Sequence, residues 1–159
     1  MNGAPGLEDL SIIEAGMHEI DLVVPLFDQY RIFYRQPSDL DAARRFLRAR
    51  IQHRDSVIFL AIMGKGANEL GAGFALLYPS FNSVTATPIW ILNDLYVLEG
   101  VRRKGVAQRL IDRGRELAED TGATLISLST GRENHPSRRL YERLGFAQDD
   151  TFCTYLLKL

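Results

Sequence analysis

The chain has 159 residues, of which 46% are hydrophobic and 25% are charged, and its formal net charge at pH 7 is −1. This length suits one compact domain with its own core, and so small a net charge provides no general attraction to nucleic acid or to an anionic membrane. No apolar run reaches the length of a transmembrane helix. We therefore expect a soluble, cytoplasmic protein that binds neither nucleic acid nor membrane.

Hydrophobic periodicity divides the chain into alternating strands and helices. In chain order these are a strand over 10–15, a helix over 19–33, a helix from a cap at Ser38 or Asp39 to Ile51, strands over 57–63, 71–78 and 89–98, a helix over 104–120, a strand over 124–129, a short helix over 135–144 and closing strands over 146–159. Pro25 lies inside the first helix and predicts a break or kink there.

The order of the elements predicts the fold class. Hairpins early and strand–helix–strand units late are typical of an α/β or α+β protein with a mixed, mostly antiparallel central sheet of about six to seven strands and about four helices. No repeat or linker interrupts the sequence, so we expect a single domain over residues 9–159 after a disordered N-terminus over residues 1–8. The one cysteine, Cys153, is expected to be a buried residue on the last strand.

A basic turn before the helix over 104–120 is the strongest functional signal. Arg102, Arg103 and Lys104 precede Gly105, although acids rather than bases normally occupy the start of a helix. Helix N-termini present unpaired N–H groups, and a glycine lets a phosphate approach the backbone closely, so the turn predicts an anion site suited to a pyrophosphate. The turn lacks the second glycine and the hydroxyl of a P-loop, and the chain has no G-x-G-x-x-G segment between a strand and a helix.

Three segments in this order resemble a known family. They are Leu92–Val97 (LNDLYV), Arg102–Ala107 (RRKGVA) and Asn134–Phe146, which contains LYERLGF. They are similar to the central strand, the R/Q-x-x-G-x-G/A pyrophosphate loop and the N-(x)-LYE-x-x-GF segment of the GNAT superfamily of N-acetyltransferases. The resemblance implies the GNAT-like (acyl-CoA N-acyltransferase) fold and transfer of the acetyl group of acetyl-CoA to an amine. Two further stretches, Asp28–Arg31 and Leu77–Phe81, are similar to the histone and polyamine acetyltransferase-like subgroup.

The resemblance also implies a binding site for acetyl-CoA. Backbone N–H groups of the basic turn would hold the pyrophosphate, main-chain groups of the central strand would pair with the pantetheine arm, and an N–H near Tyr96 or Val97 would stabilise the oxyanion. Asn134 would contact the cofactor arm, or cap the helix that follows it. Tyr141 would protonate the departing thiolate, or merely pack. The implied cofactor-binding residues are Leu95, Tyr96, Val97, Arg102, Arg103, Lys104, Gly105, Val106, Ala107, Asn134 and Tyr141.

Asp94 is the candidate general base. An amine acceptor is mostly protonated at neutral pH, so a base or a water relay must remove a proton. Asp94 interrupts an apolar strand, where an unpaired carboxylate is costly unless it has a partner or a function. Strand alternation predicts that it shares a face with Trp90, Leu92 and Tyr96. Pairing with a buried arginine is the structural alternative.

The acceptor pocket is expected on the first helix. Asp28, Tyr30 and Tyr34 would suit a cationic amine, because acids and aromatic rings both attract cations, although such a pattern more often marks an ordinary half-buried face. The acceptor would be a polyamine, a lysine or another small basic amine. No Ser or Cys lies in a nucleophile setting, so transfer would be direct, within a ternary complex.

Other properties follow from what the sequence contains or lacks. The three scattered histidines match no metal-binding spacing, so we expect no metal. The resemblance allows a homodimer. The alternative to an enzyme is a non-catalytic acyl-CoA-binding sensor or interaction domain of the same fold.

Overall fold

The structure is a computed structural model that describes residues 9–159, so the expected disorder of residues 1–8 lies outside the described part. The chain forms two compact units, one ending at Ser129 and one running from Thr130 to Leu159. Each is described by itself below.

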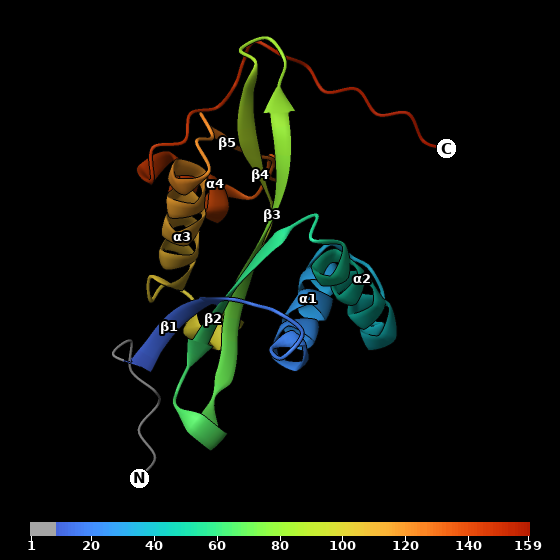
Figure 1. Ribbon diagram of the computed structural model, residues 1–159, viewed down its shortest axis with the longest axis vertical. Coiled ribbons are helices and arrows are strands. Elements are labelled where there is room, and N and C mark those ends of the chain that lie inside the picture. Colours follow the sequence, from blue (N-terminus) through green and yellow to red (C-terminus); the bar gives the residue numbers. More distant parts are fainter. Residues whose placement is uncertain (1–8) are drawn as a thin grey trace. The chain divides into compact units, whose positions relative to one another are not determined.

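The first unit is built on a five-stranded sheet whose strands lie side by side in chain order (Figure 1). They are β1 (Leu10–Glu14), β2 (Val57–Met63), β3 (Leu70–Asn82), β4 (Thr87–Val97) and β5 (Ile126–Leu128). Strands β1 to β4 pair antiparallel, whereas β5 pairs parallel with β4. The mixed, mostly antiparallel sheet is thus confirmed. Strand β2 is apolar almost throughout and its last six residues are buried, because helices cover both faces of the sheet.

Three helices cover the two faces of this sheet (Figure 1). They are α1 (Ile20–Phe33) and α2 (Leu40–His53) on one face and α3 (Val106–Asp120) on the other. Helix α1 continues through Pro25, so the predicted break is wrong. The proline removes one helical hydrogen bond, but burial of the residues on either side of it stabilises the continuous helix. Asp39, rather than Ser38, caps α2 by accepting a 2.8 Å hydrogen bond from Ala42 N–H.

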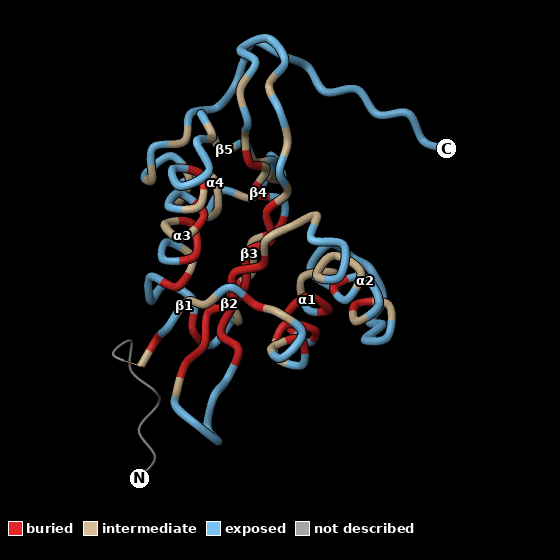
Figure 2. Tube along the Cα trace, in the orientation of Figure 1, coloured by how far each residue is buried: buried red, intermediate tan, exposed pale blue. Residues whose placement is uncertain are grey.

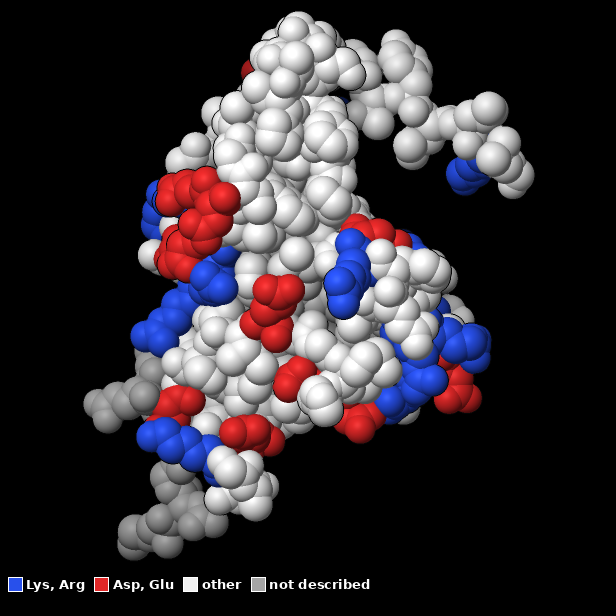
Figure 3. Space-filling view, viewed as in Figure 1, with Lys and Arg blue, Asp and Glu red and all other residues white. Residues whose placement is uncertain are grey.

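The buried residues concentrate where the helices meet the centre of the sheet (Figure 2). On the α1–α2 face, Phe74 and Leu76 of β3 pack against apolar residues of both helices. On the opposite face, Leu77 lies against α3 at Gly114, where an added Cβ would come within 3.2 Å of its side chain. Figure 3 shows Lys and Arg side chains over α2 with acids among them, and an uncharged surface over the β3–β4 hairpin.

A β-bulge in β4 changes the face on which Asp94 lies. Leu76 of β3 pairs with Asp94, and the next residue, Leu77, pairs with Leu92, so Asn93 is the extra residue. Because Leu76 and Leu77 point to opposite faces, Asp94 and Leu92 do so too. The predicted common face of Asp94 with Trp90 and Leu92 is therefore wrong. Asp94 faces the α1–α2 layer, together with Leu76.

The second unit contains the helix α4 (His135–Arg143), followed by residues 144–159, in which no strand forms. The predicted closing strands are therefore wrong, and the described sheet has five strands rather than about six to seven. Alternation of apolar residues suits a strand, but a strand forms only where a neighbouring edge pairs with its backbone. Cys153, expected to be buried on that strand, is exposed. The exposed large apolar residues of this segment are Phe152, Tyr155, Leu156, Leu157 and Leu159, each at least 80% exposed.

Candidate active site

The second half of β4 has a backbone edge that no neighbouring strand covers in the described chain. Strand β3 pairs with β4 as far as Val97, whereas β5 pairs only with Trp90 to Leu92. The N–H of Leu98 donates to Ala72 O of β3 (2.9 Å). In an antiparallel ladder the groups alternate, so the N–H and C=O groups of Leu95 and Val97 point to the open edge and those of Tyr96 point to β3. The edge can therefore pair with an extended, amide-containing ligand.

Arg102 braces the end of this strand. Its Nε donates to Val97 O (2.9 Å), and its guanidinium lies 5.5 Å from the centre of the Tyr96 ring. The side chain is therefore bound to β4, although its backbone belongs to the basic turn. A cation stacked on an aromatic ring contributes roughly 0.5–1 kcal/mol at an exposed site.

The basic turn ends at the N-terminus of α3. Arg103 and Gly105 both have left-handed backbone conformations, with φ of 60° and 80°, and α3 begins at Val106. Gly105 provides no side-chain cap, so the N–H groups of the first helical turn are unpaired by the helix itself. A Cβ at Gly105 would meet nothing within 4 Å, and Arg103 and Lys104 are exposed. An open turn with free donors and two cations fits a pyrophosphate.

Asp94 is a buried carboxylate with neutral partners. It is 5% exposed, and Asn93 Nδ2 donates to its Oδ1 (2.9 Å). Burial raises the pKa of Asp94 above its ordinary value, although hydrogen bonds from Tyr30 and Asn93 act in the opposite direction. No ion pair among residues 9–159 includes Asp94, which contradicts the alternative of a buried arginine partner. A buried carboxylate with a raised pKa is suited to accept a proton.

Three tyrosines surround this carboxylate. Tyr30 hydrogen-bonds to Asp94, and the rings of Tyr30 and Tyr34 meet edge to face with centres 5.0 Å apart. The pKa of Tyr34 is raised by burial and by the negative charge of Asp94. Burial and the negative charge of Asp94 also raise the pKa of Tyr78, whereas the positive charge of Arg50 lowers it. The predicted residues Tyr30, Tyr34 and Asp94 are thus brought together.

Sequence reasoning missed two members of this group, Tyr78 and Asn93. Tyr78 lies two residues after Leu76 on β3 and therefore shares the face of Asp94. Alternation of side chains along β3 could have placed Tyr78 on the face of Leu76. The bulge at Asn93, which the sequence does not reveal, is what places Asp94 on that same face. Asn93 is recognisable only once it is known to be the extra residue of the bulge.

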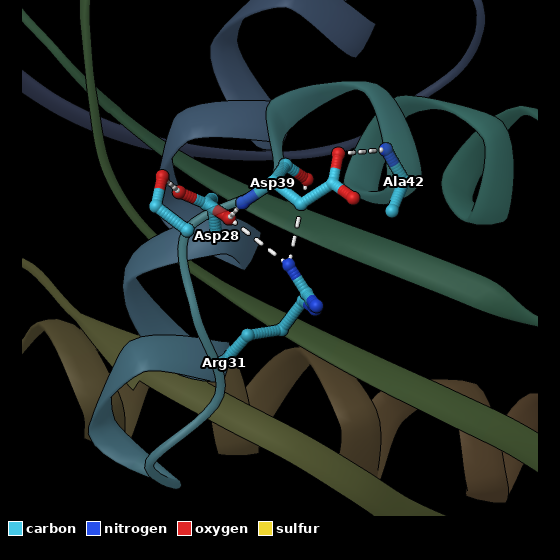
Figure 4. Close-up of polar contacts among 5 residues, drawn as sticks. Asp28, Arg31, Asp39 and Ala42 are labelled. Atoms are coloured by element: carbon cyan, nitrogen blue, oxygen red, sulfur yellow. Dashed lines mark hydrogen bonds and ion pairs between the residues drawn. The ribbon is translucent and has the colours of Figure 1, made fainter.

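Asp28, a predicted substrate residue, is engaged within the protein (Figure 4). It is 3% exposed and accepts hydrogen bonds from Arg31, Ser38 and Asp39. Burial by itself would raise the pKa of Asp28, but the hydrogen bonds from Ser38 and Asp39 and the charge of Arg31 hold it below its ordinary value. Its carboxylate joins α1 to α2, and its contact with a substrate stays a prediction.

The remaining predicted residues lie in the second unit. Asn134 caps α4 by accepting a hydrogen bond from Ser137 N–H (3.3 Å), which confirms the capping interpretation. Tyr141 is half-buried on α4, with its ring edge to face against Phe146 and ring centres 5.8 Å apart. The roles of Asn134 in cofactor binding and of Tyr141 in catalysis stay predictions. Within residues 9–159, no helix is long and apolar enough to cross a membrane, and no cluster of three or more His, Cys, Asp or Glu residues could hold a metal ion.

Comparison with known proteins agrees with this arrangement. Residues 23–146 match the model of the acetyltransferase (GNAT) family. The chain is 40% identical to an uncharacterised N-acetyltransferase of Bacillus subtilis (strain 168) over 94% of its own length and 98% of that protein. It is 33% identical to an aminoglycoside N(6′)-acetyltransferase of Serratia marcescens over 75% of its length and 80% of that protein. A crystal structure of a probable acetyltransferase superimposes with a TM-score of 0.86 at 38% identity, covering 94% of this chain and 97% of that one.

The family match spans the β4 edge, the basic turn and α4, and it extends over most of the chain. An open strand edge and a turn with exposed cations suit a long, phosphate-bearing ligand. The chain belongs to the GNAT family and is an acetyl-CoA-dependent N-acetyltransferase.

Proposed function

We propose that the protein transfers the acetyl group directly to a primary amine within a ternary complex, with Asp94 as the general base. The observation that carries this proposal is the buried Asp94, which has only neutral partners and lies next to the open edge of β4. Acetyl-CoA supplies the acetyl group as a thioester. The chain's own residues position the two reactants and move the protons.

The open edge and the turn hold the acetyl donor. The N–H groups of Leu95 and Val97 donate to the pantetheine arm and to the thioester oxygen, where negative charge develops during attack. This assignment replaces Tyr96 in the oxyanion role, because its N–H is directed to β3 by the ladder. The N–H groups from Arg103 to Ala107 receive the pyrophosphate, and Asn134 contacts the cofactor arm.

Proton transfers accompany both the formation of the N–C bond and the cleavage of the C–S bond. The acceptor enters as an ammonium ion and gives one proton to the Asp94 carboxylate, and its nitrogen then forms the new N–C bond. The C–S bond breaks, its electron pair leaves with sulfur, and the thiolate takes a proton from the Tyr141 hydroxyl. The nitrogen loses its second proton to water as the amide forms, and water restores the Tyr141 proton. Asp94 then releases its proton to water, which regenerates the base. The products are the acetylated amine, CoA thiol and one proton in solution.

The acceptor is a small amine with more than one positive charge. Tyr30, Tyr34 and Tyr78 offer aromatic rings beside Asp94, and such a group attracts an ammonium ion through the rings and the carboxylate. The relative named an aminoglycoside N(6′)-acetyltransferase supports an amine of this class. Polyamines belong to the same chemical class.

The test is release of CoA thiol from acetyl-CoA with spermidine, a lysine peptide, an amino acid and an aminoglycoside as acceptors. We expect turnover with at least one polycationic amine and none with an amine-free control. Absence of turnover with every amine, despite measured binding of acetyl-CoA, would contradict the proposed acceptor class.

Tyr141 is tested separately. We expect Tyr141→Phe to lower kcat by about 10² to 10⁴-fold, because the phenol proton is no longer available to the thiolate. The control is the affinity of the variant for acetyl-CoA, measured by calorimetry. That affinity should stay within about twofold of the wild-type value, since binding needs no proton transfer.

A further inference from the structure

The connection between α1 and α2 is short, strained and held by a buried charge. It runs from Tyr34, the C-cap of α1, to Asp39, the N-cap of α2. Arg35 within it adopts a left-handed backbone with φ of 63°, which is uncommon for a residue with a side chain. Strained backbone of this kind persists only where surrounding contacts hold it, and it gathers near functional sites.

Asp28 holds the end of this connection that leads into α2. Its Oδ2 accepts from Ser38 Oγ (2.6 Å), and its Oδ1 accepts from Asp39 N–H (2.9 Å) and from Arg31 Nη1 (3.1 Å). Figure 4 shows the carboxylate between α1 and the first turn of α2. Arg31 Nη1 also lies 3.4 Å from Asp39 O, so carboxylate and guanidinium together hold the end of the connection at Ser38 and Asp39. Buried hydrogen bonds to a charged group are among the stronger polar contacts in proteins.

The connection begins at a residue of the candidate acceptor site. Tyr34 is 47% exposed, its N–H is bonded to Tyr30 O (3.3 Å), and its ring contacts the Tyr30 ring. Tyr30 in turn hydrogen-bonds to Asp94. The contacts of Asp28 therefore hold one end of the connection, and Tyr34 at its other end contacts Tyr30, the partner of the group assigned as the base.

We propose that Asp28 is a positioning residue, whose buried carboxylate fixes the 34–39 connection and so holds Tyr34 in place beside Asp94 for the amine acceptor. The inference rests on the proposed function, because it assigns Tyr34 to the acceptor site. It differs from direct recognition, in which the Asp28 carboxylate itself would contact the amine. None of these contacts involves Leu95, Val97 or the basic turn, which are assigned to acetyl-CoA, so loss of the carboxylate should affect the amine and spare acetyl-CoA.

The test measures the kinetics of three variants, with spermidine, a lysine amide and kanamycin each used as the amine acceptor. Asp28→Asn keeps the shape of the side chain but loses its charge, and Ser38→Ala removes one hydrogen bond from an exposed residue. Asp21→Asn is the matched control, because Asp21 is also an α1 acid that pairs with α2, through Arg44, but its side chain is 77% exposed.

We expect Asp28→Asn to raise the KM of the amine about tenfold and Ser38→Ala to raise it about threefold, with the KM of acetyl-CoA unchanged in both. Asp21→Asn should match the wild type. Equal increases in the KM of the amine and in the KM of acetyl-CoA would indicate a general structural defect and would overturn the inference. An unchanged amine KM in Asp28→Asn would also overturn it. If Asp28→Asn does not fold, Ser38→Ala decides the question by the same criterion. A wild-type protein that acetylates no amine would instead refute the proposed function.

Discussion

Two buried carboxylates in the first unit have pKa values shifted in opposite directions, and this difference separates their roles. At Asp94 the effect of desolvation outweighs that of hydrogen bonds from two neutral donors, so its pKa is raised. Asp28 has a cation and two further donors, so its pKa is lowered. A raised pKa in the folded state favours the protonated form and suits a base, whereas a lowered pKa keeps a structural carboxylate charged.

Asp94→Asn is expected to reduce kcat by about 10² to 10⁴-fold, because the amide cannot accept the proton of the ammonium ion. In the wild type, kcat/KM should fall as the pH drops through the raised pKa of Asp94, and this acid limb should be absent from the residual rate of the variant. Steady-state kinetics across pH, with calorimetry for acetyl-CoA, measure both effects. Unchanged turnover would remove Asp94 from the mechanism.

The same substitution should not destabilise the protein at neutral pH. A folded-state pKa raised above the unfolded value means that Asp94 contributes stability at low pH and loses that contribution as the pH rises through the folded pKa. The ionised carboxylate thus lowers the free energy of unfolding at pH 7. In urea titrations the free energy of unfolding of Asp94→Asn should therefore equal or exceed that of the wild type. A large loss of stability would indicate a structural role for the charge.

Asp28→Asn should show the opposite behaviour. Because the folded pKa lies below the ordinary value of 3.8, the stabilisation by Asp28 is present above that pH and is lost as the pH falls through the folded pKa. We expect the variant to lose about 1–3 kcal/mol of unfolding free energy at pH 7. Urea titrations at pH 7 and in acid should show this difference shrinking at low pH, and a difference that grew would contradict the assignment.

At the scale of the elements, the packing of β3 against β4 controls the shape of the donor site. Gly73 of β3 lies against the backbone of β4, where an added Cβ would be 2.6 Å from Tyr96 O and 3.2 Å from Val97 Cα. These are backbone atoms, so the strand itself would have to move. The glycine is therefore required by close approach, and its effect should reach the open edge at Val97.

Gly73→Ala is accordingly expected to weaken acetyl-CoA binding about tenfold, on the scale that an ångström-sized displacement costs. Gly114→Ala is the matched control, because its Cβ would approach only a Leu77 methyl group, at 3.2 Å, on the other face of the sheet. It should lower the melting temperature while leaving the dissociation constant within about twofold of wild type. Calorimetry on both variants separates the two effects, and equal affinities would argue against the β4 edge as the donor site.

At the scale of the whole molecule, a group of large apolar residues at the end of the chain is highly exposed. Phe152, Tyr155 and Leu157 lie on a segment without a strand partner in the described chain. Exposed apolar side chains in such a group favour association, because burial against another molecule removes them from water. This agrees with the homodimer that the family resemblance allows.

Light scattering tests this expectation. The full chain should have twice the mass of one chain, and a variant that ends at Asp150 should shift toward the mass of a single chain. Substitution of Val84, which is also exposed but lies on the β3–β4 hairpin, with Ser is the control and should leave the mass unchanged. A full-length chain that is monomeric at all concentrations would contradict the proposed association.

Features that depend on contiguous residues were predictable without the structure. The basic turn at residues 102–107 is built from neighbours in the chain, and local rules predicted both the turn and the helix that follows it. Helix α3 and the cap of α4 at Asn134 were likewise local. The family and the class of reaction followed from these segments, since their order and spacing are properties of the sequence.

Only the tertiary structure decided which distant residues meet. One extra residue at Asn93 reversed the face of Asp94, because side chains alternate along a strand and a bulge shifts that alternation. The same register placed Tyr78 on the face of Asp94, and the packing of α1 beside α2 left Asp28 bonded to Ser38 and Asp39. The apolar pattern of residues 146–159 predicted strands that did not form, since a pattern records which face is apolar but not whether a neighbouring edge is available to pair with it.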